Sequence, residues 1–158
     1  MQRRLMVRSG ALLLGAIVGA RPVIGLAAGK PAVEVWKSPT CGCCQDWIGH
    51  LQANGFQVTT YDVSEAAKAA LRRKLGLADK FSSCHTALID GYVVEGHVPA
   101  REISRLRRER PKAVGLAVPG MPVGSPGMDG PLNQGRKDGY AVLLVQRDGN
   151  ASVYQSYR

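Results

Sequence analysis

Hydrophobic residues recur along the chain with two periods, one of two residues and one close to 3.6. The stretches AVEVW (residues 32–36) and FQVTTYDV (56–63) have the short period and the β-branched and aromatic residues of strands. Between these two stretches, apolar residues recur with the helical period. This pattern ends at Asn54-Gly55, a dipeptide typical of the end of a helix. One apolar helix face is predicted to contain Cys44, Trp47, Ile48 and Leu51. The pattern therefore predicts a strand, a helix and a second strand.

Two further helices and a hairpin are predicted downstream. Ser64 is placed to cap a helix that ends at Gly76. Its predicted apolar stripe consists of Ala67, Ala70, Leu71 and Leu75. TALI and YVVEG flank Asp90-Gly91, a dipeptide typical of hairpin turns. Pro99 suits the first turn of a third helix. The inward residues of that helix are predicted to be Ala100, Ile103 and Leu106.

The resulting order, β-α-β-α-β-β-α, is that of a thioredoxin-like α/β domain, whose active site lies at the first strand-to-helix turn. Residues 111–139 follow as a long loop rich in Pro, Gly and Met, with no pattern that predicts a strand. A loop of that length is usually functional or disordered. YAVLLVQ and ASVYQSY then flank Asp148-Gly149 and predict a C-terminal β-hairpin over residues 140–157.

Residues 1–28 have the pattern of a cleaved export signal. Three arginines precede the apolar run ALLLGAIVGA, and small residues follow, which predicts cleavage near Ala28. Arg21-Pro22 interrupts the apolar stretch, so it is too short to span a bilayer. An uncleaved N-terminal anchor is the alternative. Cleavage predicts a single domain of residues 29–158 in the periplasm, without a stable transmembrane segment.

The charge of the chain does not point to nucleic acid. Residues 1–28 hold four arginines and no acid, so their removal lowers the net charge from +9 to +5, which is ordinary for a soluble domain. Many remaining basic residues lie in REISRLRRERPK (101–112), interspersed with Glu102 and Glu109 and without aromatic residues. That composition is typical of a solvated helix face. No nucleic-acid partner is predicted.

Three of the four cysteines lie in TCGCC, at the predicted start of the first helix. Cys41 and Cys44 have the C-x-x-C spacing of disulfide oxidoreductases, in which the helix N-terminus stabilises a thiolate. These two residues are therefore candidates for thiol–disulfide catalysis. Cys43 argues for a different use, because a third thiol would compete in exchange. Three clustered thiolates completed by a fourth sulfur suit Cu(I) or zinc.

Cys84 and His85, in SSCHTALI, are the candidates to complete such a metal site. They come just before the third predicted strand, whose entry faces the active-site turn in a thioredoxin-like fold. Other roles stay open at this point. Cys84 would also be explained as a disulfide partner of Cys43 or as a small buried residue, and His85 as a residue that orients a neighbouring ligand.

Weaker candidates lie outside the cysteine motifs. Met121 and Met128 occur in the Pro/Gly-rich loop, and thioethers are soft ligands that prefer Cu(I) to zinc. Hydrophobic anchoring of the loop is the alternative use of these methionines. His97, in EGHVPA, is predicted either to assist the site or to cap the third helix. His50 is predicted to lie on the surface.

Three blocks of sequence resemble the CopG-type exported copper-resistance proteins, which are thioredoxin-like domains long catalogued as a domain of unknown function. The blocks are VEVWKSPTCGCCQDWIGHL, SCHTALIDGYVVEGHVPAREI and GLAVPGMPVGSPGM, and the resemblance extends over about residues 32–157. It implies periplasmic copper handling, with Cys41, Cys43, Cys44 and Cys84 as ligands and His85 as a further one. Whether copper is stored, transferred or changed in oxidation state is not implied.

Two functions of different classes follow from these observations. The first is a periplasmic copper-binding protein for copper resistance or homeostasis, which holds one or several thiolate-bridged Cu(I) ions and works with other periplasmic copper-handling proteins. The second is a thiol–disulfide oxidoreductase that uses Cys41 and Cys44. Zinc is the alternative metal.

Overall fold

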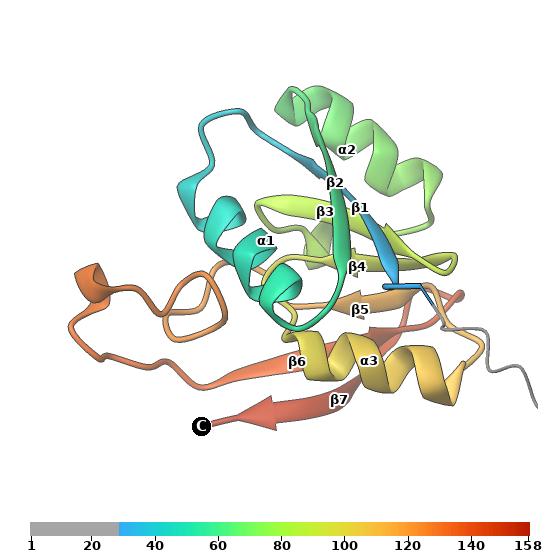
Figure 1. Cartoon of the computed structure of the whole chain (residues 1–158). Coiled ribbons are helices and arrows are strands. Elements are labelled where there is room, and N and C mark those ends of the chain that lie inside the picture. Colours follow the sequence, from blue (N-terminus) through green and yellow to red (C-terminus); the bar gives the residue numbers. More distant parts are fainter. Residues whose placement is uncertain (1–28) are drawn as a thin grey trace, which may run out of the picture.

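The computed structural model describes residues 29–158, which form one seven-stranded sheet and three α-helices (Figure 1). The predicted export signal, residues 1–28, lies outside the described residues. The sheet order is β2-β1-β3-β4-β5-β6-β7. The strands are β1 (Ala32–Lys37), β2 (Gln57–Asp62), β3 (His85–Ile89), β4 (Tyr92–Glu95), β5 (Gly115–Ala117), β6 (Tyr140–Val145) and β7 (Ala151–Tyr157). The helices are α1 (Gly42–Ala53), α2 (Glu65–Lys74) and α3 (Ala100–Glu109), and short 3₁₀ turns occupy Asp79–Phe81 and Pro131–Asn133.

Helices cover both faces of the sheet. α1 and α3 pack on one face, where the larger core joins Trp47 and Leu51 of α1 to Ile103 and Leu106 of α3. α2 lies across the other face (Figure 1), where a smaller core includes Leu77 and other residues next to the sheet. Neighbouring residues of one strand enter different cores, because successive side chains point to opposite faces. Val94 and Val93 of β4 are such a pair.

The predicted element order and α/β class are confirmed, and the arrangement is consistent with a thioredoxin-like fold. β1 and β2 are parallel, while β3 runs antiparallel to both β1 and β4. Ser64 caps α2 by accepting a hydrogen bond from the Ala67 N–H. The four residues predicted for the apolar face of α1 are its buried residues: Cys44, Trp47, Ile48 and Leu51. The predicted C-terminal hairpin is β6–β7.

The predicted apolar stripe of α2 is wrong for its two alanines but right for Leu75, which packs against the smaller core. The buried residues of this helix are Lys68 and Arg72, whereas Ala67 and Ala70 are exposed. Alanine side chains offer little apolar area, while the long stems of Lys and Arg cover more of the sheet and carry charged ends to polar groups beyond it. Hydrophobicity alone therefore misplaced the first half of the buried face of this helix.

The prediction that residues 111–139 contain no strand is also wrong, because β5 lies within them. Its three residues are too short to show an alternating pattern, and pairing with β4 and β6 makes them a strand. Gly115 is required there, because a Cβ atom at this position would lie 1.8 Å from the Val93 carbonyl oxygen. The rest of the segment is a loop of successive turns, of which we call residues 118–130 the Met loop.

Within residues 29–158, no helix combines the length and the apolar character needed to cross a membrane.

Candidate metal centre

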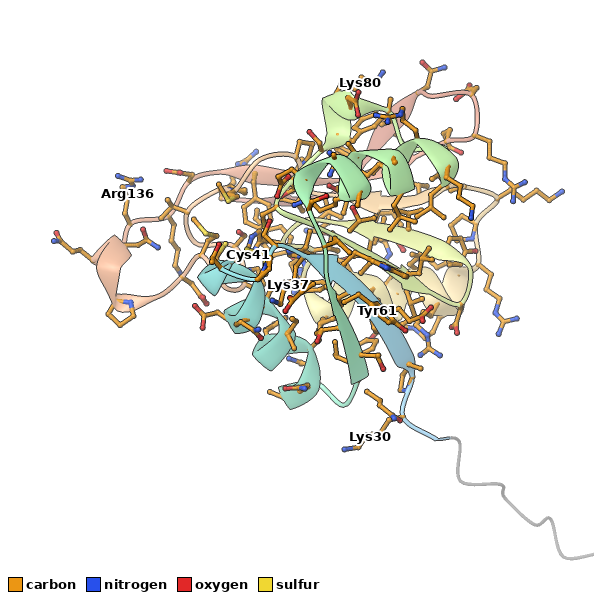
Figure 2. All side chains as sticks on the ribbon, turned by 90° about the horizontal axis from the view of Figure 1, so that it is seen from above. Lys30, Lys37, Cys41, Tyr61, Lys80 and Arg136 are labelled. Atoms are coloured by element: carbon orange, nitrogen blue, oxygen red, sulfur yellow. A yellow bond between two sulfur atoms is a disulfide. The ribbon has the colours of Figure 1, made fainter. Side chains whose placement is uncertain are left out.

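The cysteine turn, Cys41 to Cys44, connects β1 to α1. Cys41 is the residue before the helix, and Cys44 is fully buried on the inner helix face. A disulfide joins Cys41 to Cys44. Cys43 is a free thiol whose Sγ lies 3.6 Å from the Sγ of Cys41. In Figure 2, sulfur atoms gather near the labelled Cys41, at the side of the molecule from which the loop with Arg136 projects.

Sheet pairing brings Cys84 to this turn from 40 residues away. Lys37, at the end of β1, is paired with His85, at the start of β3, so the residues next to both lie close together. The sulfur atoms of Cys41, Cys43, Cys44 and Cys84 all lie within 4.8 Å of one another. Cys84 is a free thiol, like Cys43, so the alternative disulfide between these two residues is not present.

Cys84 also contacts two histidines. Its Sγ lies 3.3 Å from Nδ1 of His85 and 3.0 Å from Nε2 of His97. The His97 Nδ1–H donates to the carbonyl oxygen of Pro126 at 2.8 Å, which assigns the lone pair to the nitrogen that faces Cys84. His97 therefore does not cap α3; Pro99 is the residue that precedes this helix. His97 was only a weak candidate from the sequence, and the structure brings it into contact with the site.

His85 is held in a fixed orientation with one ring nitrogen unused. Its ring lies against that of Trp47, with 4.2 Å between centroids, and Trp47 is anchored by donating from Nε1 to the Val98 carbonyl oxygen. The buried Nε2 atom of His85 has no hydrogen-bond partner among residues 29–158. A metal ion held together with Cys84 would bind the other ring nitrogen, Nδ1, which faces the Cys84 sulfur.

Burial keeps these donors uncharged in the absence of metal. Burial, helped by the nearby Cys43, raises the pKa of the Cys84 thiol to about 12. Burial lowers the pKa of His97, and burial together with His97 lowers that of His85 well below its usual value. Both imidazoles are therefore in the neutral form that binds metals. A metal ion would have to displace the proton of Cys84, so metal binding would release protons.

The Met loop lies against both halves of this cluster. Gly127 packs so closely on α1 that a Cβ atom there would lie 2.6 Å from the Cys43 carbonyl oxygen. Gly120 donates its N–H to the Ser82 carbonyl oxygen, close to Cys84. Met128 follows Gly127 directly and is half-buried, whereas Met121 is 52% exposed. The loop thus brings the residues that precede both methionines, Gly120 and Gly127, against the two halves of the cluster.

His50 was predicted to be a surface residue, and this is only partly right. It is half-buried, and its Nε2 accepts a hydrogen bond of 3.1 Å from the Ala100 N–H at the start of α3. No local motif signals this role, because the donor is 50 residues away. His50 therefore stabilises a helix start and is not a member of either group of candidate ligands.

The donors fit a soft metal ion. Two overlapping groups share Cys84: the four cysteines, and Cys84 with His85 and His97. Thiolate sulfur and neutral imidazole are the ligands that Cu(I) and zinc prefer, and no carboxylate belongs to either group. Reduction of the disulfide would be needed before Cys41 and Cys44 could bind as thiolates.

Comparisons with known proteins identify the family of the chain. A family model described as "Protein of unknown function, DUF411" matches residues 81–128. Two solved structures of copper resistance protein CopG, termed Form 1 and Form 2, are 49% and 51% identical to the chain. The matched region includes 81% and 82% of this chain, and 98% and 99% of the two CopG chains. The TM-scores are 0.74 and 0.73. The chain belongs to the CopG family. No curated protein matches it.

The two kinds of match cover different parts of the candidate metal centre. The DUF411 segment contains Cys84, His85, His97 and both methionines of the Met loop, but not the cysteine turn. The two CopG structures match most of the chain, at about half identity. Membership of the CopG family thus rests on nearly the whole described domain.

Proposed function

We propose that this CopG-family protein binds copper as Cu(I) in the periplasm and serves copper resistance or homeostasis. The observation that carries the proposal is the position of Cys84. One sulfur atom lies next to three other cysteine sulfurs on one side and two neutral imidazole nitrogens on the other. Solved structures termed copper resistance protein, about 50% identical to the chain, support copper as the metal.

The donor types favour Cu(I) over zinc. Zinc sites in proteins are satisfied by four ligands in tetrahedral geometry, and this centre offers six candidate donors from two overlapping groups. Six donors suit a cluster of several Cu(I) ions, in which a bridging thiolate sulfur binds two ions at once. Cys84, common to both groups, is the residue best placed to bridge. The two methionines of the Met loop, as weaker candidate ligands, add further soft donors.

The test is an anaerobic Cu(I) titration of the fully reduced protein, followed by elemental analysis. We expect at least one tightly held copper per chain. X-ray absorption at the copper edge should show sulfur ligands and, if thiolates bridge, a short copper–copper distance. The Cys43→Ser variant keeps the C-x-x-C pair and is expected to bind copper more weakly. Less than one tightly bound copper per wild-type chain would contradict the proposal.

The Cys41–Cys44 disulfide favours a second candidate, thiol–disulfide exchange. Cys41 is partly exposed and Cys44 is buried, so an incoming thiolate would attack Cys41 and release Cys44 as the leaving thiolate. A second thiolate of the reductant would then release Cys41 and form the reductant's own disulfide. Insulin reduction by dithiothreitol separates the candidates: acceleration that is lost in Cys41→Ser would support exchange.

The periplasmic location rests on the export signal predicted for residues 1–28. Intact-mass measurement on the protein recovered from a periplasmic fraction would test both location and domain boundary. We expect a mature chain that begins close to residue 29. A full-length chain retained in the membrane fraction would instead support the uncleaved anchor.

A further inference from the structure

A buried lysine lies directly behind the metal-site backbone. Lys68 of α2 is only 1% exposed, which is rare for a lysine. Its Nζ donates to the carbonyl oxygen of Cys84 and to the Glu65 carboxylate, the latter at 2.8 Å. The Glu65 side chain is 71% exposed, so water screens much of its negative charge. The ammonium therefore faces the metal centre on its buried side and a well-solvated partner on the other.

The Cys84 carbonyl connects this ammonium to both halves of the site. The Sγ of Cys44 lies 3.9 Å from the same oxygen atom that accepts from Lys68. Lys68 thus lies close to candidate sulfur ligands from the cysteine turn and from the segment before β3.

Positioning alone does not explain a charged residue here. Residues on both sides of Cys84 are already anchored by the fully buried Glu95, which accepts from the backbone N–H of Ser83 at 2.7 Å and from the side-chain hydroxyl of Thr86 at 2.6 Å. A neutral donor in place of Lys68 would satisfy the Cys84 carbonyl at a much lower cost of burial. What a lysine adds over such a donor is a positive charge.

That charge has a use once thiolates bind metal. Four cysteine thiolates carry four negative charges, and each Cu(I) ion brings one positive charge, so every loading below four copper ions leaves the centre anionic. Excess negative charge in a partly buried site disfavours the thiolate form of the ligands. We propose that Lys68 is the counter-ion of the metal centre and strengthens Cu(I) binding through its charge. This inference rests on the copper-binding function proposed above.

The test compares Cu(I) affinity, from competition with a chromophoric Cu(I) chelator, in four variants and the reduced wild type. Lys68→Met removes charge and hydrogen bond, whereas Lys68→Gln keeps a donor of similar length. Glu65→Gln removes the opposing carboxylate from an exposed position. Lys74→Met is the matched control, because it removes one positive charge from an exposed position of the same helix. Thermal unfolding of each metal-free variant shows whether it is folded.

Both Lys68 variants are expected to bind the first copper about tenfold more weakly, which corresponds to about 1.4 kcal/mol. Glu65→Gln should bind about twofold more tightly, and Lys74→Met should bind as the wild type does. The opposite sign for Glu65→Gln is not expected from structural damage. The Glu65→Gln variant also keeps the proposal testable if Lys68→Met does not fold.

Two results would overturn the proposal. If Lys68→Gln binds copper like the wild type, the hydrogen bond suffices and the charge has no role. If Glu65→Gln weakens binding, the electrostatic sign is wrong. A wild-type protein that does not bind Cu(I) would instead refute the copper-binding function itself, so the two failures are distinguishable.

Discussion

The two halves of the metal centre are built in different ways. The cysteine turn supplies three thiols from four consecutive residues at the open end of a helix, and Cys41 and Cys43 are partly exposed. The Cys84 half brings together residues from the start of β3 and the segment before α3. Its two histidines are fully buried. The cysteine turn is thus formed by residues close together in the sequence and is partly exposed to solvent. The Cys84 half is formed by residues that only the fold brings together, and its histidines are buried.

This difference suggests a division of roles. A thiol at a partly exposed helix start is accessible to exchange partners and to incoming metal. Buried candidate donors whose orientation is fixed by Trp47 and by the Pro126 carbonyl would lose little freedom on binding a metal ion, so we expect them to set its affinity and geometry. Cys84 belongs to both groups of ligands, and substitutions there should show the contrast most strongly.

The largest effect is expected for Cys84→Ser. This change removes the sulfur shared by both ligand groups, so Cu(I) affinity should fall by at least about a hundredfold, measured by chelator competition under anaerobic conditions. Cys41→Ser removes a partly exposed donor that belongs to only one group of candidate ligands. This change should lower the Cu(I) affinity about tenfold. Equal losses in the two variants would show that the halves contribute alike and would remove the contrast.

A smaller effect is expected for Gly127→Ala, which tests whether the Met loop closes over the cysteine turn. Gly127 has a φ of +84°. An added Cβ would lie 2.6 Å from the Cys43 carbonyl oxygen and 2.7 Å from the backbone nitrogen of Trp47. Both strain and collision oppose the change, and we expect a loss of about 2–3 kcal/mol in the free energy of unfolding, measured with urea. Copper release should also become faster.

The control for this variant is Gly120→Ala. Gly120 has a similar φ of +71°, but no atom outside its chain neighbours would lie within 4 Å of its Cβ. Only backbone strain opposes this change, so the loss should be about 1 kcal/mol. Equal destabilisation by the two substitutions would mean that the contact between loop and helix contributes nothing.

The smallest effect is expected for His50→Ala. Burial lowers the pKa of His50, and its neutral ring accepts from the Ala100 N–H. Since the folded state resists protonation, the stability contributed by His50 is present above the usual histidine pKa and is lost as pH falls below about 6.5. The variant should lose about 1 kcal/mol at pH 7.5 and less at pH 5.

Urea unfolding at both pH values measures this, with Gln52→Ala, an exposed change on the same helix, as the control. A loss in His50→Ala that is the same at pH 5 and pH 7.5 would contradict the assigned hydrogen bond. His85 and His97 also have lowered pKa values, so the wild type should lose stability in the same direction on acidification.

Much of the fold could be predicted because its signals are local. The helix face of Cys44, Trp47, Ile48 and Leu51 followed from the spacing of apolar residues, and the Ser64 cap from its position before a helix. The errors concern residues whose environment is set from a distance. Lys68 and Arg72 are buried because α2 lies over polar groups of Cys84 and Glu95, next to and within the middle strands β3 and β4. β5 is a strand only because its neighbours pair with it.

The candidate site likewise has one part that local sequence signals predict and one part that distant residues determine. By itself, the sequence determined the three-thiol turn, because four consecutive residues at a helix start are necessarily close in space. Resemblance and fold order also indicated Cys84 and His85 as partners. Only the tertiary structure decided that His97 joins them, that His50 does not, and that a buried ammonium lies behind Cys84. These contacts depend on sheet register and helix docking, which bring together residues many positions apart and leave no periodic trace in the sequence.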